Sequence, residues 1–343
     1  MQTRRVFLKI LLGLGAATLP WSLLPTLFRD AVKTKLVLPP VQLLLPPRTN
    51  VNNVINAENL GCTALDDISA LTSSEMQGRR AGSKGEVRAA EYLSSQLSML
   101  GLKPMGDSET GFAHVFTLPR VTEILVNGRL TFKSEPIQLR IPSVNLLGAL
   151  IGKKTEEIIL LSAHYDHLGI FKGQIYPGAN DNASGVGCVL DVMRRILREG
   201  KTPRRTIILA FWSAEEMGFV GSKAFVRSAP FPLHYIQAVF NVDTIGNGMI
   251  GDFALWTDGE NLAFRAIRQA ATEVGASVQR APQGAHNSDS ISFASVGIPA
   301  VTLMARDWLY KNHTTEDNIE LLKPEQINLA SEIVYRAVQI LAF

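Results

Sequence analysis

Four short, nearly continuous apolar runs alternate with longer segments of helical periodicity in the second half of the chain. The runs cover residues 158–163, 206–212, 236–242 and 300–304. Runs of this length and composition are typical of strands that are buried on both faces. Apolar positions recur with helical spacing in residues 184–198, 219–228, 260–274 and 324–341. The alternation predicts an α/β fold: a three-layer sandwich with a mostly parallel mixed sheet and helices on both faces.

The first half of the chain adds one helix and one hairpin to this plan. Apolar residues between Ser83 and Leu100 follow a helical period, and Gly101 ends the pattern. Residues 112–150 hold alternating runs around Asn127-Gly128, the dipeptide that most favours a two-residue β-turn. We therefore predict an amphipathic helix, a hairpin and a single folded domain over residues 57–343.

The N-terminus has the layout of an export signal. Arg4-Arg5 precede Phe7-Leu8-Lys9, and residues 10–28 contain no charge, a pattern that resembles the twin-arginine signal. Residues 1–28 are thus predicted to be a signal or an anchor that directs the protein to the periplasm or the exterior. Cleavage and membrane attachment through residues 6–28 both stay open, because an apolar run of this length nearly spans a bilayer. Residues 29–56 contain two Pro-Pro pairs and predict a linker.

Charge and cysteine content exclude several classes of protein. The formal charge is +3, of which residues 1–35 supply +5, so the remainder carries −2 and has no basic cluster suited to nucleic acid. The two cysteines, Cys62 and Cys188, are too few for a disulfide framework. Cys188 lies in an apolar helical segment, which favours a buried, inert thiol.

Acidic and imidazole side chains follow the predicted strands directly. His164 and Asp166 come after the first run, and Glu215-Glu216 come after the second. Asp243 ends the third run, and His313 lies in the loop after the last. Because ligands of open α/β sheets bind outside the carboxyl ends of the strands, we expect these groups to converge on one crevice.

The types of these side chains point to a divalent metal. Imidazole together with carboxylate favours zinc over magnesium or calcium, and the lack of thiolates argues against a closed structural zinc site. Five ligand groups are more than one open catalytic ion requires. Two ions about 4 Å apart that share a carboxylate would use all of them.

Five segments, in this order, resemble the di-zinc aminopeptidase family, which shares its fold with glutaminyl cyclases. They are Ala163-His164-Tyr165-Asp166-His167-Leu168-Gly169, Pro177-Gly178-Ala179-Asn180-Asp181-Asn182-Ala183-Ser184-Gly185, Ala214-Glu215-Glu216-Met217-Gly218, Asn241-Val242-Asp243 and Asn312-His313-Thr314-Thr315-Glu316-Asp317. The likeness runs from about Ser74 to the C-terminus. It implies an exopeptidase that binds two Zn²⁺ per chain and hydrolyses the N-terminal bond of peptides with a free amino terminus.

The resemblance also assigns roles to individual residues. Asp181 would bridge the two ions, with His164 and Asp243 completing one site. Glu216 and His313 would complete the other site. Glu215 would act as general base, and Asp166 would accept the other ring proton of His164 and so fix its tautomer. The family often has a cis peptide after the bridging aspartate, here Asp181-Asn182.

Other residues carry weaker signals. Asp181 by itself could cap the following helix. His114, His167, His234 and His286 are expected to have no role at the site, whereas Trp308, Tyr310 and Phe171 are candidate walls of a specificity pocket. Ser290 stands where the family often has a histidine near the substrate, so the function of that position is open here.

Three alternatives to an aminopeptidase remain at this point. The first is a glutaminyl cyclase-like aminoacyltransferase, which needs one zinc ion. A carboxypeptidase or dipeptidase with the same metal chemistry is the second, and a binding protein that has lost catalysis is the third. The complete set of ligands and base disfavours the last of these. We expect a monomer whose partners are peptides, with no nucleic acid.

Overall fold

The computed structural model describes residues 63–107, 111–282 and 288–343. The predicted signal (1–28) and linker (29–56), Cys62 and His286 lie outside these ranges, so their assignments stay predictions. None of the helices in the described ranges has the length and apolar content needed to cross a membrane.

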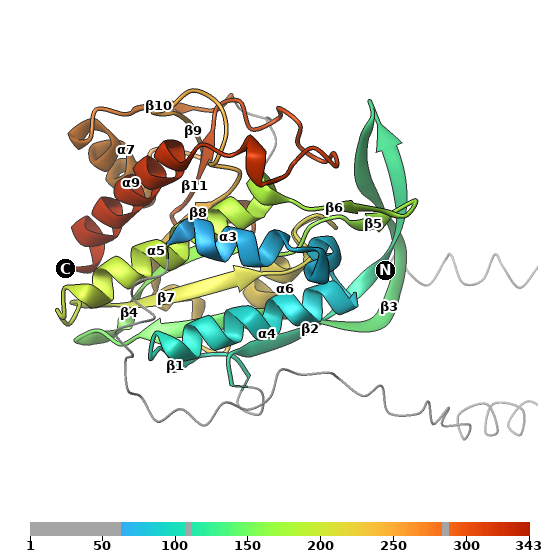
Figure 1. Cartoon of the computed structure of the whole chain (residues 1–343). Helices are drawn as coiled ribbons and strands as arrows, with labels where there is room; N and C mark the ends of the chain where they lie inside the picture. The colour runs from blue at the N-terminus through green and yellow to red at the C-terminus, as the bar shows by residue number, and fades with distance from the viewer. Residues whose placement is uncertain (1–62, 108–110, 283–287) are drawn as a thin grey trace, which may run out of the picture. The chain divides into compact units, whose positions relative to one another are not determined.

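A nine-stranded sheet forms the centre of the described chain (Figure 1). Its order is β1-β3-β7-β4-β8-β11-β9-β10, and β2 pairs with β3 alone. The strands are β1 (Lys103–Pro104), β2 (Ala113–Val126), β3 (Arg129–Leu150), β4 (Lys154–His164), β7 (Arg205–Trp212), β8 (Ile236–Val242), β9 (Asp252–Trp256), β10 (Ser277–Arg280) and β11 (Ala300–Ala305). The four apolar runs of the sequence are β4, β7, β8 and β11, as predicted.

These four strands lie side by side and parallel in the middle of the sheet. β3 runs antiparallel to β7 on one side, and β9 runs antiparallel to β11 on the other. The predicted mostly parallel mixed sheet is thus confirmed. Because the central strands are parallel, their carboxyl ends share one edge, where the candidate site is built.

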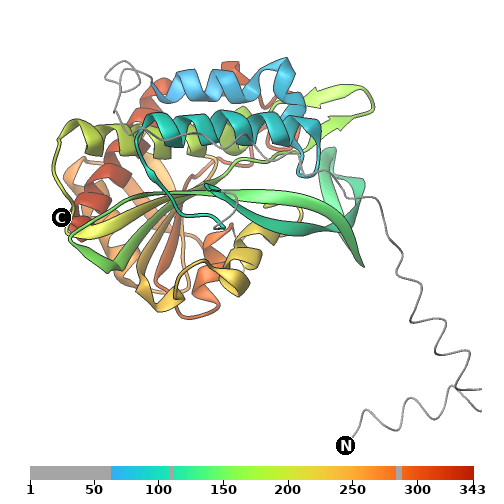
Figure 2. The same cartoon turned by 90° about the horizontal axis from the view of Figure 1, so that it is seen from below.

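Helices cover both faces of the sheet, which confirms the three-layer sandwich (Figure 2). The helices are α3 (Ala64–Thr72), α4 (Lys84–Met99), α5 (Ser184–Arg198), α6 (Val220–Ser228), α7 (Leu262–Glu273), α8 (Ser290–Ala294) and α9 (Pro324–Ala342). Alternate residues of β4 face the two sides of the sheet: Ile159 and Leu161 pack with α3, α4, α5, α7 and α9, whereas Ile158 and Leu160 pack with α6 and α8.

Cys188 is buried in the larger core, and burial raises the pKa of its thiol to about 12, as expected of an inert cysteine.

The predicted first-half elements are also present. α4 begins after Ser83, whose side chain accepts hydrogen bonds from the amides of Gly85 and Glu86 and so caps the helix. β2 and β3 form the hairpin, and Asn127 and Gly128 both have positive φ at its turn. This is the conformation that a type I′ turn requires.

Several elements are not predicted by the sequence pattern. α3, the strand β9, the edge strand β10, and the small hairpin of β5 (Gly169–Phe171) and β6 (Gln174–Tyr176) are short, or lack a long apolar run. Tertiary contacts rather than local periodicity establish them.

Candidate metal centre

The predicted site residues lie around one cavity at the carboxyl edge of the parallel strands. The cavity has a volume of about 720 Å³. His164 is the last residue of β4, Asp243 follows β8, and His313 lies in the loop after β11. Together with Asp181, Glu215 and Glu216 they all line this cavity. The side chains that the sequence places after different strands thus meet at a single edge of the sheet.

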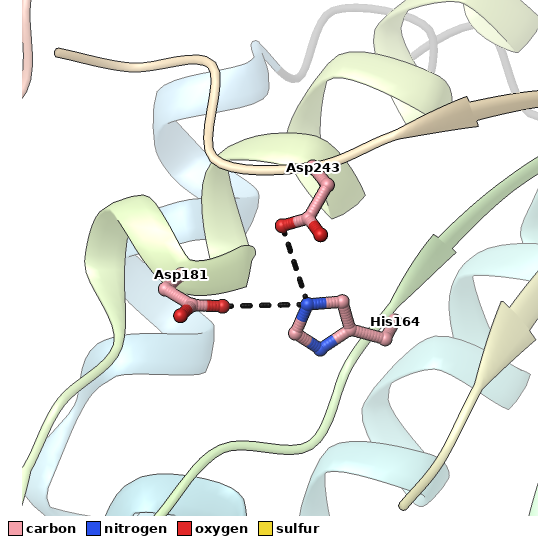
Figure 3. Close-up of side chains that lie close together, drawn as sticks. All are labelled: His164, Asp181 and Asp243. Carbon is pink, nitrogen blue, oxygen red and sulfur yellow. Dashed lines mark hydrogen bonds and ion pairs between the residues drawn. The ribbon is translucent and has the colours of Figure 1, made fainter. Parts of the chain in front are cut away.

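One group of potential metal ligands surrounds the imidazole of His164 (Figure 3). Its Nε2 atom lies 3.3 Å from Asp181 Oδ1 and 3.3 Å from Asp243 Oδ1. All three side chains are buried. One nitrogen or oxygen atom from each side chain can be chosen so that the three atoms all lie within 4.8 Å of one another. A cation bound by all three side chains requires such a spacing.

A second group lies on the other side of Asp181. His313 Nε2 is 3.2 Å from Asp181 Oδ2 and 3.0 Å from Glu216 Oε2. The remaining oxygen of Glu216 lies 2.8 Å from His167 Nδ1. The two oxygens of Asp181 thus face different groups, as a bridging carboxylate must.

The backbone around Asp181 is held by hydrogen bonds from distant segments. Residues Ala179–Ala183 form the π-helical turn η4, and the Asp181-Asn182 peptide is cis, as the resemblance implies. Asp317 Oδ1 accepts from the amide of Asn180 at 2.7 Å, and its Oδ2 accepts from the amide of Asp181 at 3.0 Å. Asp181 does not cap α5, because its side chain points into the site and the helix has no side-chain cap.

The side chain of Asn182 ties the same turn to the strand that carries Asp243. Its Nδ2 donates to the carbonyl of Val242 at 2.9 Å, and its Oδ1 accepts from the amide of Thr244 at 3.1 Å. Both contacts are made by residues that flank Asp243. The hydrogen bonds of the buried residues Asn182, Val242 and Thr244 therefore set the distance between Asp181 and Asp243.

Asp166 differs in detail from the expectation. Its Oδ1 lies 3.7 Å from His164 Nδ1, beyond hydrogen-bond distance, whereas its backbone carbonyl lies 3.3 Å from the same nitrogen. Asp166 Oδ1 instead accepts from the amide of Glu215 at 3.0 Å. Asp166 thus contacts the segment of the proposed base, and it orients His164 through its carbonyl rather than through its carboxylate.

Opposite charges determine the ionisation of the two histidines. Burial lowers the pKa of His164, but Asp243 and Glu215 outweigh this effect and raise it well above the usual range. Burial also lowers the pKa of His313, and Glu216 and Asp181 again raise it well above the usual range. The site is thus strongly negative and attracts positive charge to both imidazoles.

The pKa values of the adjacent carboxylates Glu215 and Glu216 shift in opposite directions. Burial opposes ionisation of Glu216, but the neighbouring His313 holds its pKa at about 2. Glu215 behaves in the opposite manner, because burial raises its pKa well above the usual range and the charge of Glu216 adds to the shift. The two adjacent glutamates therefore differ in their tendency to ionise, and perturbed pKa values of this kind cluster at functional sites.

The donor set fits a pair of divalent cations. Nitrogen and oxygen donors without thiolate are typical ligands of zinc at open sites. Four carboxylates in one cavity repel one another unless positive charge is bound between them. The spacing that a shared cation requires is found for His164, Asp181 and Asp243 and for His167, Asp181 and Glu216. His313 Nε2 lies 3.2 Å from Asp181 and 3.0 Å from Glu216 of the second set. The residues that would hold the ions are His164, Asp181, Asp243, Glu216 and His313, with His167 beside them.

His167 is the residue that sequence reasoning missed. The sequence predicts a loop histidine without a role, yet its ring is fully buried against Glu216 and His313. Its spacing of three residues from His164, just past a strand end, is the available signal. Of the three candidate pocket walls, Trp308 lines the cavity, whereas Tyr310 lines a neighbouring hollow and Phe171 packs beneath the β2–β3 hairpin.

Ser290 lies close to the site without lining the described part of its cavity. It is buried at the start of α8, and its hydroxyl accepts a hydrogen bond from Thr302 Oγ1 at 2.7 Å. A histidine at this position would need more space than the serine occupies. The serine therefore packs beneath the site in this chain.

The fold is shared with solved structures of a zinc aminopeptidase and of a glutaminyl cyclase. The structure of BSAP, a zinc aminopeptidase from Bacillus subtilis, is similar with a TM-score of 0.66 and 18% identity, covering 84% of this chain and 96% of that one. Fimbriiglobus ruber glutaminyl cyclase gives a TM-score of 0.60 at 16% identity, with coverages of 81% and 94%. These likenesses establish the fold.

The chain belongs to peptidase family M28, whose sequence profile matches residues 145–338, more than half of its length. Aminopeptidase YwaD of Bacillus subtilis is 30% identical over 211 residues, which cover 57% of this chain and 44% of that protein. Leucine aminopeptidase 1 of Leptosphaeria maculans is 27% identical over 217 residues, 57% of this chain and 55% of that protein. The chain thus spans about half the length of these relatives.

Proposed function

We propose that the chain is a metal-dependent aminopeptidase that binds two zinc ions and uses Glu215 as general base. The observation that carries the proposal is the pair of histidine–carboxylate groups that share Asp181, with Glu215 lining the same cavity but belonging to neither group. When bound, the ions supply Lewis-acid polarisation of the scissile carbonyl and activation of water. Asp181 would bridge them, with His164 and Asp243 on one side and Glu216 and His313 on the other.

Glu215 is suited to act as the general base that accepts a proton from water. It lines the cavity without contributing to either group of ligands, and burial raises its pKa, which makes the carboxylate a stronger base. In the proposed reaction Glu215 takes a proton from the attacking water and delivers it to the departing amine. The hydrogen bond from its amide to Asp166 holds the backbone at this residue in place.

The free amino terminus of the substrate would bind at the negatively charged end of the cavity. Asp181, Glu215, Glu216 and Asp243 supply that charge. Trp256, Trp308 and Met304 give the same cavity an apolar wall, and the two indole rings are in edge-to-face contact with centroids 5.6 Å apart. This wall would receive the side chain of the first residue, which makes the substrate a peptide with a free N-terminus.

A panel of aminoacyl fluorogenic substrates, with and without a chelator, tests the proposal on the purified full chain. Hydrolysis that is lost with chelator and restored by zinc is the expected result. N-acetylated versions of the same substrates should not be cleaved, whereas peptides blocked at the carboxyl end should still be. Cleavage that requires a free carboxyl end instead would indicate a carboxypeptidase.

The structural similarity to a glutaminyl cyclase makes cyclisation of N-terminal glutamine the second candidate function. A cyclase would convert a peptide with N-terminal glutamine to a cyclic product with loss of ammonia, and we expect it to need one ion. Mass spectrometry of the intact protein counts bound zinc, and the same instrument detects the cyclised peptide. Two ions per chain without cyclisation would support the aminopeptidase.

The proposal also includes export of the enzyme from the cytoplasm. The twin-arginine-like signal of residues 1–28 would deliver the folded enzyme to the periplasm or the exterior, either free or membrane-anchored. N-terminal sequencing of the protein from fractionated cells distinguishes a cleaved signal from a retained one. A cytoplasmic pool that begins at Met1 would contradict export.

A further inference from the structure

The tip of the β2–β3 hairpin is built into the active-site wall, although it lies outside the segment that matches the family profile. The amide of Leu130 donates to the carbonyl of His313 at 3.1 Å, and His313 Nδ1 donates to the carbonyl of Leu130 at 2.8 Å. Leu130 is also buried with Leu168 and Tyr176. The tip is therefore fixed directly beside a candidate metal ligand.

These contacts place Arg129 at the cavity. Val126, Asn127, Arg129 and Thr131 all line it, and Arg129 Nη2 donates to the carbonyl of Leu309, another lining residue. This solvent-exposed contact ties the guanidinium to a lining residue from a distant segment of the chain. Arg129 directly precedes Leu130, whose backbone contacts His313, so the Cα atoms of these two neighbours are about 3.8 Å apart.

The charge of Arg129 has no counterpart among its neighbours. Among the described residues that line the cavity, Arg129 is the one lysine or arginine, whereas four lining residues are carboxylic acids. No carboxylate in the described part of the chain lies within ion-pair distance of its guanidinium. Only one of its five N–H groups is used by a hydrogen bond within these residues.

We propose that Arg129 binds the C-terminal carboxylate of a short peptide substrate, which rests on the proposed aminopeptidase function. A dipeptide or tripeptide carries an ammonium group at one end and a carboxylate at the other. The cavity offers carboxylates at its floor and a guanidinium at its rim, and guanidinium pairs with carboxylate in a bidentate geometry. A tripeptide spans about 10 Å, which is within reach of a cavity of about 720 Å³.

The test compares three substrates that share the same first residue: a dipeptide, its C-terminal amide and an aminoacyl arylamide. On the zinc-loaded full chain, Arg129→Gln should raise KM for the dipeptide by about 10- to 100-fold and leave kcat within about twofold. KM for the amide and the arylamide should change by less than about twofold, because neither carries the carboxylate. Arg129→Lys should recover part of the loss, since it keeps the charge but not the bidentate geometry.

Arg120→Gln is the matched control. Arg120 lies on β2 of the same hairpin, is exposed, pairs with Glu135 at 3.2 Å and does not line the cavity. Its substitution should leave all three substrates unaffected. Thermal unfolding of both variants should match that of the unmodified chain, which separates substrate binding from loss of the hairpin.

Equal losses on the dipeptide and its amide would overturn the assignment and leave Arg129 with a structural role at Leu309. An unchanged KM for the dipeptide would overturn it as well. In both cases a wild-type chain that cleaves the arylamide would still support the aminopeptidase. A zinc-loaded wild-type chain that cleaves none of the three substrates would instead overturn the proposed function and this inference with it.

Discussion

His167 Nδ1 and Glu216 Oε1 are joined by a hydrogen bond of 2.8 Å in the interior of the candidate metal centre. The imidazole is fully buried, and its other nitrogen, Nε2, has no hydrogen-bond partner among the described residues. The ring also packs edge-on against His313, with centroids 5.8 Å apart. His167 therefore fixes the orientation of one carboxylate that the proposed second ion needs.

Substituting His167 by alanine should weaken metal binding at the second site. Partners that orient metal ligands typically contribute 10- to 100-fold to metal affinity, and we expect a loss in that range. Competition with a chelator, followed by a metal count per chain, measures it. His234→Ala is the control, since His234 is exposed and distant from the site. Equal metal content in both variants would reduce His167 to a packing role.

Replacing Glu215 by glutamine should separate catalysis from metal binding. Glu215 lines the cavity but belongs to neither group of potential ligands, so the variant should retain both ions. Without a general base, the rate should fall by roughly two to four orders of magnitude. Steady-state kinetics and a metal count on the same sample test both halves. Hydrolysis at the wild-type rate would remove Glu215 from the mechanism.

The guanidinium of Arg79 organises the two loops that carry His164 and Asp181. It is fully buried, and burial lowers its pKa to about 10, so it stays charged at neutral pH. Its nitrogens donate to the carbonyls of Tyr165 at 2.8 Å, Leu71 at 2.7 Å, Pro177 at 2.7 Å and Gly178 at 2.9 Å. A planar side chain with several donors is needed to satisfy four carbonyls in different directions.

Arg79→Lys should therefore destabilise the fold by about 2–4 kcal/mol, because a lysine cannot reach all four buried carbonyls. Metal affinity should fall in parallel, since the loops of both ligands lose their anchor. Urea unfolding of the zinc-free chain measures the stability term. Arg80→Lys provides the comparison: Arg80 pairs with Glu123 near the surface, so its substitution should cost less than about 1 kcal/mol. Similar losses in both variants would contradict the anchoring role.

Glu86 should make stability depend on pH. Its carboxylate is buried on α4 and accepts hydrogen bonds from Ser143 and Ser213, yet burial raises its pKa from 4.5 to about 7. Between these two values the folded chain holds a proton that the unfolded chain has lost. Stability from this group is therefore complete below pH 4.5 and falls as pH rises to about 7, by about 3 kcal/mol in total.

Glu86→Gln removes this titration, because the amide stays neutral and can still hydrogen bond. The variant should lose less stability than the wild type between pH 5 and pH 8. Urea unfolding at several pH values, on zinc-free protein, gives the difference. Parallel stability curves for the two proteins would show that Glu86 does not titrate in this range.

The sequence predicts the central strands, and the edge where the strand-end side chains meet, for one physical reason. Buried parallel strands need continuous apolar residues, so β4, β7, β8 and β11 are visible as short runs. Ligands must follow the carboxyl ends of those strands, so the positions of His164 and Asp243 along the chain already indicate a shared site. Helix α4 is equally clear, because Ser83 caps it and Gly101 follows it.

Other features could not be predicted from local sequence. His167 follows the end of β4 by three residues, which indicates that it lies near the site, but this spacing does not predict that its ring is buried against Glu216. The family resemblance implies that the carboxylate of Asp166 accepts a hydrogen bond from His164. In the structure Asp166 Oδ1 lies 3.7 Å from His164 Nδ1 but 3.0 Å from the amide nitrogen of Glu215, so it accepts from Glu215 instead. Such distinctions depend on packing between segments that lie far apart along the chain.

The amino-acid sequence alone determined the class of fold, the edge where the candidate site lies and the types of side chain gathered there, because these depend on hydrophobic periodicity and on side-chain type. The tertiary structure decided which donors share Asp181, that His167 joins them and that Arg129 reaches the cavity from a hairpin more than 180 residues before His313. Distances of 2.7–3.3 Å between such residues arise only when the layers of the domain are packed, since no local propensity encodes them.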